Sequence, residues 1–364
     1  MINKPTLLLD EGKCRSNIHQ MVSKARRNNV ILRPHFKTHQ SHEIGQWFRE
    51  EGIDKITVSS LTMAQYFAQD GWNDITVAFP TNILEIETIN ELAKKITLRL
   101  VVESLETVTF LAKHLTAPIH GWIKIDAGYH RTGISATNYD GISALMFAMD
   151  DADKITLDGF LLHAGHSYAC RSKEAIIDIH HQSIEALDTL KKHFDHRYPP
   201  LKLSLGDTPT CSVAEDFSLV DEIRPGNFVF YDVTQSQIGS CALEQIAIAM
   251  ACPVVAIHKD RNEVIVYGGS VHFSKDTIDD NGVDTFGVMV ETKSNGWGDV
   301  IHGAYMKKLS QEHGTIHMPS EKITQIKVGD IVTLLPVHAC TTSNLMRSYQ
   351  TTADERHIAR MSSL

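Results

Sequence analysis

Residues 119–133 read IHGWIKIDAGYHRTG, a short apolar run that ends in a polar segment containing two glycines. The run shows little alternation of polar and apolar residues, which is typical of a parallel strand buried on both faces. Seven more runs of this kind occur between residues 30 and 231, with amphipathic stretches between them. Eight strands with intervening helices favour a (β/α)8 barrel, with a doubly wound open sheet as the alternative.

The predicted elements alternate along the chain, and several helices begin after a Ser, Thr or Asn cap. The predicted strands are 30–33, 56–58, 75–79, 98–102, 119–125, 155–162, 201–205 and a split run at 219–231. The predicted helices are 17–28, 42–51, 62–70, 85–94, 106–115, 142–150 and 172–193. No GxGxxG follows the first strand, which disfavours a dinucleotide-binding sheet.

The pattern changes after residue 232, where strands and turns replace long helices. The strands expected there are 245–258, 263–267, 286–291 and 331–335. Turn-rich pieces at 279–282 and 294–296 indicate a mostly antiparallel β domain. We therefore expect a barrel over residues 10–235 and a β domain over 236–364. The short run Thr6–Leu9 could belong to either domain, so residues 1–9 are a possible addition to the second.

Composition excludes several classes of function. The 364 residues are 42% hydrophobic and 22% charged, which suits a folded protein with a large core. A net charge of -9 argues against nucleic acid and against a polybasic membrane anchor, and no apolar run is long enough for a bilayer crossing. The N-terminus does not resemble a signal peptide, and the six irregularly spaced cysteines indicate reduced thiols. We expect a cytoplasmic protein.

Chemistry in a barrel sits where strands end, and several predicted strands end in unusual polar segments. Those segments are 33–39, 124–133, 163–168, 206–210 and 224–227. Lys37 stands in the first of them among aromatic and histidine residues, without an adjacent acid. A partly buried lysine can act as a Schiff-base nucleophile. The last two segments, GDTPT and RPGN, offer the backbone N–H groups and hydroxyls that bind phosphate in barrels. Together they suggest pyridoxal phosphate.

With these segments in this order, the chain resembles the fold-type III pyridoxal-phosphate enzymes, which have an alanine racemase-like barrel. Within them it resembles the branch that contains D-serine dehydratase and D-threonine aldolase. Each motif is weak alone, but the ordered set is specific and covers essentially the whole chain. The motifs are RPHFKTH at 33–39, DAGYHRTG at 126–133, GHSY at 165–168, GDTPT at 206–210, RPGN at 224–227, EHG at 312–314 and PVHAC at 336–340.

The resemblance implies roles for the matching residues. Lys37 would carry the cofactor as a Schiff base. Arg131 would face the phenolic oxygen of the cofactor, His163 would lie against its ring, and Arg224 matches the arginine that meets the pyridine nitrogen in alanine racemase. The phosphate would be held by a group of residues from three segments: Tyr168, Thr208, Thr210, Gly226 and Asn227.

Some of these residues also have purely structural interpretations. Asp126 could cap a turn, and Arg224 could form an ion pair that closes the barrel. His35 and His39 could shape the loop around Lys37, and residues 312–314 could be a loop or part of a substrate pocket.

The implied activity is a lyase that converts a D-3-hydroxy amino acid, such as D-serine, to a 2-oxo acid and ammonia. Hydroxide leaves poorly, so a Lewis acid on the β-oxygen helps. His338 and Cys340, at i and i+2 after a predicted strand, would present imidazole and thiolate on one face and favour Zn2+. A D-threonine aldolase, a D-threo-3-hydroxyaspartate dehydratase, an amino-acid racemase and a non-catalytic cofactor carrier are the alternatives. The expected assembly is a homodimer.

Overall fold

The computed structural model describes residues 2–198, 200–280 and 282–361. The chain forms two compact units, one of residues 19–226 and the other of residues 1–18 together with 227–364. Helix α1 (Glu11–Arg27) is continuous across this division, so its first two turns belong to one unit and the rest to the other.

Eight parallel strands form the sheet of the 19–226 unit, in the order β2-β10-β9-β8-β6-β5-β4-β3. A parallel bridge between His35 and Thr57 joins the two outer strands, and the Phe36 N–H donates to the Thr57 carbonyl at 2.8 Å. This bridge closes the sheet, which confirms the predicted (β/α)8 barrel. Its strands are β2 (Ile31–Leu32), β3 (Ile56–Val58), β4 (Asp74–Pro80), β5 (Thr97–Val102), β6 (Ile119–Asp126), β8 (Ile155–Leu162), β9 (Lys202–Leu205) and β10 (Glu222–Ile223), and the short β7 (Ile134–Ser135) pairs with β6.

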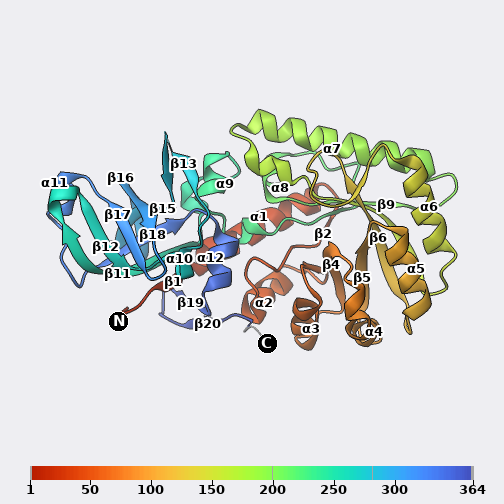
Figure 1. Cartoon of the computed structure of the whole chain (residues 1–364), viewed down its shortest axis with the longest axis horizontal. Coiled ribbons are helices and arrows are strands. Elements are labelled where there is room, and N and C mark those ends of the chain that lie inside the picture. Colours follow the sequence, from red (N-terminus) through yellow and green to blue (C-terminus); the bar gives the residue numbers. More distant parts are fainter. Residues whose placement is uncertain (1, 199, 281, 362–364) are drawn as a thin grey trace. The chain divides into compact units, whose positions relative to one another are not determined.

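Helices connect successive strands and cover the outside of this sheet (Figure 1). They are α2 (His42–Glu50), α3 (Leu61–Gln69), α4 (Ile86–Ala93), α5 (Leu105–His114), α6 (Tyr139–Asp150), α7 (Lys173–Phe194) and α8 (Thr208–Val213). Each predicted helix is present with small differences at its ends, except that α1 starts at Glu11 rather than at Asn17. Asp10 caps it by accepting from the Lys13 N–H at 3.0 Å, and the polar first turn hides its periodicity in the sequence.

A layer of buried charges fills the barrel beside the amino ends of β4 and β10. Arg33 donates to Glu222 at 2.7 Å and to Asp74 at 2.6 Å. Arg99 bridges Asp74 and Asp158, so the charges form one connected network. Since unpaired charges are costly inside a protein, this pairing explains how the barrel interior tolerates them.

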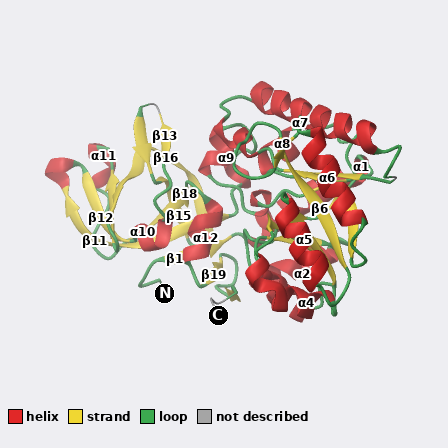
Figure 2. Ribbon diagram, turned by 45° about the vertical axis from the view of Figure 1, so that its right-hand side comes forward, coloured by secondary structure: helices red, strands yellow, loops and turns green. Residues whose placement is uncertain are grey.

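The second unit is built on a closed antiparallel barrel in the order β12-β17-β16-β15-β18-β11, with β11 pairing back onto β12 (Figure 2). Its strands are β11 (Ile248–His258), β12 (Glu263–Tyr267), β15 (Gly287–Lys293), β16 (Gly296–Leu309), β17 (His313–His317) and β18 (Ile331–Pro336). This confirms the predicted antiparallel β domain. Smaller elements complete the unit: β1 (Thr6–Leu9), β13 (Ile278–Asp280), β14 (Val283–Thr285), β19 (Ser348–Thr351), β20 (His357–Ala359), α9 (Val233–Gln237), α10 (Ser270–Phe273), α11 (Ser320–Ile323) and α12 (Ala339–Leu345).

Two features of this unit were not determined by sequence patterns. Strand β1 pairs antiparallel with β11, Leu7 opposite Met250, and thereby joins this sheet. Strand β16 is absent from the predicted elements because its glycines, its polar residues and its irregular pairing with β15 and β17 break the strand pattern. The motif at 312–314 leads into β17, where His313 pairs with Tyr267.

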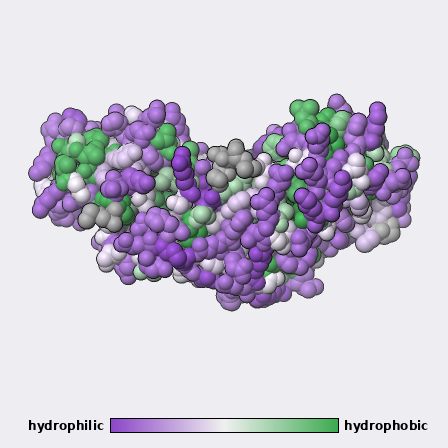
Figure 3. All heavy atoms as spheres, turned by 90° about the horizontal axis from the view of Figure 1, so that it is seen from below, coloured by the Kyte–Doolittle hydropathy of each residue, from purple (hydrophilic) through white to green (hydrophobic). Residues whose placement is uncertain are grey.

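Hydrophilic residues cover most of the molecular face in Figure 3, with smaller hydrophobic groups between them. Throughout the described part of the chain, no helix has both the length and the apolar character needed to cross a membrane.

Candidate active site

Lys37 lies half-buried in the turn that follows β2, at the carboxyl ends of the barrel strands. His35, two residues earlier, accepts a long hydrogen bond from the Lys37 N–H at its Nδ1, 3.4 Å away. Burial lowers the pKa of His35 well below its ordinary value, and the nearby charges of Lys37 and Arg224 lower it further. His35 is therefore neutral, and with Nδ1 accepting, its Nε2 carries the proton.

His163 directly follows β8, and its two ring nitrogens have the opposite donor and acceptor roles to those of His35. Its Nδ1 is hydrogen-bonded to the Gly206 carbonyl, which can only accept, so the Nδ1 carries the proton and Nε2 is a free acceptor. Burial, followed by the charges of Lys124 and Arg131, keeps the pKa of His163 well below its ordinary value. The site thus contains two neutral imidazoles, one able to donate and the other able to accept.

Lys124 is a residue of the site that was not predicted from the sequence as a functional residue. It projects from β6, is almost fully buried, and donates to the Ile125 carbonyl at 3.2 Å. Burial and then the neighbouring guanidiniums of Arg224 and Arg131 lower the pKa of Lys124 to about 7. The sequence did contain an indication of this role. A lysine inside the apolar run IHGWIKID must direct its ammonium into the barrel interior, or else leave it buried among apolar side chains.

The loop that carries Arg131 is organised by Asp126. Asp126 Oδ1 accepts from the backbone N–H groups of Gly128, Tyr129 and His130, each at 3.0 Å. Although burial opposes it, these bonds hold the pKa of Asp126 below its usual value. The structural interpretation of Asp126 as a turn cap is therefore correct. The guanidinium of Arg131 lies over the Tyr129 ring, 4.9 Å from its centroid.

Three loops at the ends of β8, β9 and β10 form a small cradle of hydroxyl and N–H groups. The Tyr168 hydroxyl accepts from the Thr208 N–H at 3.3 Å, and the Thr208 hydroxyl accepts from the Gly226 N–H, also at 3.3 Å. A Cβ added to Gly226 would lie 2.9 Å from the His35 Cβ and from the His35 carbonyl, so the close approach requires glycine. We call Tyr168, Thr208 and Gly226 the anion cradle.

Thr210 and Arg224 occupy the wall behind this cradle. The hydroxyl and the N–H of Thr210 are both directed to Asp207. Arg224 donates from Nε to Ser204 at 2.6 Å and from Nη2 to the Leu162 carbonyl at 2.7 Å. Burial lowers the pKa of Arg224 to about 10. Its guanidinium thus connects β8 and β9 by hydrogen bonds at the base of the site.

His338 and Cys340 belong to the other unit, where the structure corrects their expected backbone. The extended segment does not reach Cys340: β18 ends at Pro336, and His338 occupies the N-cap position of helix α12 with an extended backbone and no side-chain cap bond. Cys340 lies in the first turn of this helix. Their side chains nevertheless interact. Although burial opposes it, hydrogen bonds with Asp276 and Cys340 raise the pKa of His338 to about 11. Among the described residues, no group of three or more His, Cys, Asp or Glu side chains could hold a metal.

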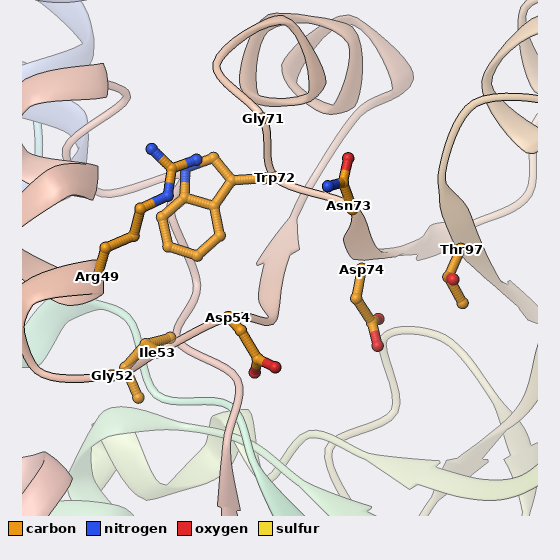
Figure 4. Close-up of a pocket in the computed structure, with 9 residues that line it drawn as sticks. All are labelled: Arg49, Gly52, Ile53, Asp54, Gly71, Trp72, Asn73, Asp74 and Thr97. Carbon is orange, nitrogen blue, oxygen red and sulfur yellow. The ribbon is translucent and has the colours of Figure 1, made fainter.

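A cavity of about 570 Å3 opens at the other end of the barrel (Figure 4). It contains Asp74 and Thr97, the first residues of β4 and β5, and Arg49 stacked on Trp72 at 4.3 Å. Because barrel chemistry belongs at the carboxyl ends of the strands, this cavity is separate from the candidate site.

Comparison with known families and proteins agrees with this geometry. Residues 9–233, more than half of the chain, match the family described as "Alanine racemase, N-terminal domain". The chain belongs to this family. Residues 247–352 match a second description, "Putative serine dehydratase domain".

Relatives of similar length cover nearly the whole chain. The D-serine dehydratase of Dictyostelium discoideum is 28% identical over 98% of this chain and 95% of its own length. The D-threo-3-hydroxyaspartate dehydratase of Delftia sp. (strain HT23) is 27% identical over 97% and 94%, and its solved structure superposes with a TM-score of 0.93 over 100% and 99% of the two chains. A D-threonine aldolase from Filomicrobium marinum, at 16% identity and a TM-score of 0.79 over 99% and 96%, shares the fold. The expected family, fold and class of enzyme are confirmed.

Proposed function

We propose that this chain is a pyridoxal-phosphate- and zinc-dependent lyase that converts a D-3-hydroxy amino acid, D-serine or a close analogue, to a 2-oxo acid and ammonia. The observation that carries the proposal is the meeting of Lys37, two neutral imidazoles and the anion cradle at one end of the barrel. The full-length similarity to two D-amino acid dehydratases supports the choice of reaction.

The residues of the barrel fit the proposed cofactor. Positive charge surrounds one site. It comes from four side chains, Lys37, Lys124, Arg131 and Arg224, which lower the pKa values of neighbouring groups in the same site: His35, His163 and Lys124. Such a site suits a ligand that carries a phosphate and a phenolate. The Gly226 position leaves no room for a Cβ. The hydroxyls of Tyr168 and Thr208 accept from backbone N–H groups and would use their own hydrogens to donate to phosphate oxygens.

When bound, pyridoxal phosphate supplies an electron sink for the Cα of an amino acid. Lys37 would hold the cofactor covalently and, once exchanged for substrate, take the Cα proton at its Nζ. Arg131 would face the phenolic oxygen and His163 the ring. Tyr168, Thr208 and Gly226, with Asn227 next in the chain, would hold the phosphate, while Thr210 and Arg224 would support that arrangement from behind.

His338 and Cys340 fit a metal with few protein ligands. With Nδ1 bonded to Asp276, His338 hydrogen-bonds Cys340 through its Nε2, and a metal ion would take the place of the proton between these two groups. The Asn227 amide is 3.7 Å from the Cys340 sulfur. Imidazole with thiolate favours Zn2+ over Mg2+ or Mn2+. Zinc would supply a Lewis acid for the departing β-hydroxyl. One similar solved structure is described as a D-threo-3-hydroxyaspartate dehydratase variant in the metal-free form, which supports the proposal of a metal.

We also propose that the two domains expected from the sequence have different roles. The barrel of residues 10–235 would bind the cofactor, and the β domain of residues 236–364 would carry the metal pair. A cytoplasmic homodimer is part of the proposal. None of the six cysteines, all of which lie in the described part of the chain, forms a disulfide, which suits a reducing compartment. Sedimentation of the active protein tests the dimer, and an active monomer would contradict it.

The experiment that tests the reaction is a comparison of substrates. The holoenzyme is incubated with D-serine, D-threonine and D-threo-3-hydroxyaspartate, and 2-oxo acid, ammonia and aldehyde are measured separately. We expect stoichiometric 2-oxo acid and ammonia. Preference for D-threo-3-hydroxyaspartate over D-serine would favour the activity named for the Delftia relative, and release of glycine with an aldehyde would overturn the dehydratase proposal.

A further inference from the structure

Asp207, which directly precedes Thr208 of the anion cradle, is a buried carboxylate with both oxygens hydrogen-bonded. Its relative exposure is 2%. Oδ1 accepts from the Ser167 hydroxyl at 2.9 Å and from the Thr210 N–H at 2.7 Å, and Oδ2 accepts from the Thr210 hydroxyl at 2.6 Å. These three bonds direct the charge into the wall of the site and away from the cradle donors.

The Ser167–Asp207 bond joins two loops at the residues next to the cradle. Ser167 precedes Tyr168 after β8, and Asp207 precedes Thr208 after β9. Beside this bond, the Tyr168 hydroxyl meets the Thr208 N–H. His163 and the Gly206 carbonyl form a further tie between the same two loops. The relative position of Tyr168 and Thr208 is therefore set by three contacts between the loops, of which the Ser167–Asp207 bond is the one made to a carboxylate.

Capping of helix α8 does not explain a buried carboxylate here. Ser104 caps α5 with the same pattern, accepting from the Thr107 N–H at 3.2 Å and meeting the Thr107 hydroxyl at 2.9 Å. A neutral, half-buried serine is sufficient for that function. Burial raises the pKa of Asp207 to about 6, which shows that its charge is costly where it lies. What Asp207 has and Ser104 lacks is the bond to a second loop.

We propose that Asp207 is a positioning residue for the cofactor phosphate, holding Tyr168 and Thr208 in the spacing that the phosphate requires without touching it. This inference rests on the proposed function. It assigns to the second residue of the GDTPT motif a task distinct from that of its neighbour Thr208, and it makes Ser167 part of the same support.

The test compares pyridoxal phosphate with pyridoxal, which lacks the phosphate. Dissociation constants of both are measured by absorbance and fluorescence with the cofactor-free full-length protein, for the wild type and for Asp207→Asn and Ser167→Ala. Asparagine still caps α8 but offers one acceptor oxygen instead of two. Ser104→Ala is the matched control, because it removes a cap of the same geometry on another loop.

We expect pyridoxal phosphate to bind about tenfold more weakly to Asp207→Asn and Ser167→Ala, the scale for losing a hydrogen bond to a charged group. Pyridoxal binding should stay within about twofold, which also shows that each variant is folded, and Ser104→Ala should change neither constant. Equal weakening of both ligands, or no weakening in either variant, would overturn the positioning role. A wild type that does not distinguish the two ligands would instead overturn the proposed function.

Discussion

The Nδ1 of His338 lies 2.9 Å from Oδ2 of Asp276. The same carboxylate oxygen accepts from the hydroxyls of Thr341 at 2.6 Å and Ser274 at 3.0 Å. A carboxylate held by this many donors fixes the orientation and the tautomer of the imidazole. The ring is thereby prepared to offer Nε2 to a metal together with the Cys340 thiolate.

Asp276→Ala should weaken metal binding by about 10- to 100-fold, the usual effect of removing a carboxylate behind a ligating histidine. Zinc content after dialysis against graded chelator measures this. The exposed carboxylate of Asp299 in β16 provides a control, since Asp299→Ala should retain metal like the wild type. Equal zinc retention in both variants would show that Asp276 does not orient the ligand.

Chelation should abolish ammonia release while leaving the cofactor absorbance in place, because the proposed metal ligands, His338 and Cys340, are distinct from Lys37. Zn2+ should restore the activity, and Cys340→Ala should neither bind zinc nor respond to it. Full dehydratase activity in metal-free protein, or in Cys340→Ala without zinc, would contradict the role given to the metal.

Borohydride should trap the cofactor on Lys37. Peptide mapping of the reduced protein identifies the modified lysine, and Lys37→Ala should form no stable adduct. Lys124→Ala is a demanding control because Lys124 supplies a second buried amine at the same site. If the adduct is found on Lys124 in the wild-type protein, Lys37 is not the attachment point.

The stability of the cofactor-free protein should depend on pH through Lys124. Burial and then the guanidiniums lower its pKa to about 7, against about 10.4 for an unfolded lysine. Between these values the unfolded chain binds more protons, so this group lets the free energy of unfolding rise with pH, by up to about 1.4 kcal/mol per unit.

Urea unfolding at pH 7, 8 and 9 tests this effect. The wild type should gain stability relative to Lys124→Met over that range, whereas the exposed Lys202, replaced in the same way, should leave the profile unchanged. Parallel profiles for the wild type and Lys124→Met would mean that Lys124 titrates normally.

The buried pair Arg33–Glu222 should be sensitive to removal of one partner. The Arg33 and Glu222 side chains are 2% and 4% exposed. Glu222→Ala leaves the buried guanidinium with Asp74 as its remaining carboxylate partner and should cost about 3 kcal/mol of unfolding free energy, the lower end of the range for a broken buried pair. The double variant Arg33→Met/Glu222→Leu should lose less. Denaturant unfolding of the three proteins measures the difference, and a double variant less stable than Glu222→Ala would contradict it.

The barrel could be predicted from local patterns because each strand that is buried on both faces is a short run of apolar residues. The barrel strands 56–58 and 155–162, and the strand 263–267 of the β domain, are predicted with their observed bounds, and the order of strands and helices leads to the closed parallel sheet. The residues that carry the resemblance, Lys37 and the segments 206–210 and 224–227, follow strand ends and were therefore expected at one mouth. Apolar periodicity and turn residues are properties of adjacent positions, so a single sequence can reveal them.

Tertiary structure decided which distant side chains meet. The lowered pKa of Lys124 and the role of Asp207 depend on groups from other segments, because the surroundings of a buried ammonium or carboxylate come from distant parts of the chain. His338 and Cys340 were predicted to lie in an extended segment after a strand, whereas the chain turns into helix α12 there. Local patterns along the chain are enough to predict the repeating strands and the lysine motif. The pairing of charges and the backbone at His338 and Cys340 depend on long-range packing, which local spacing does not encode.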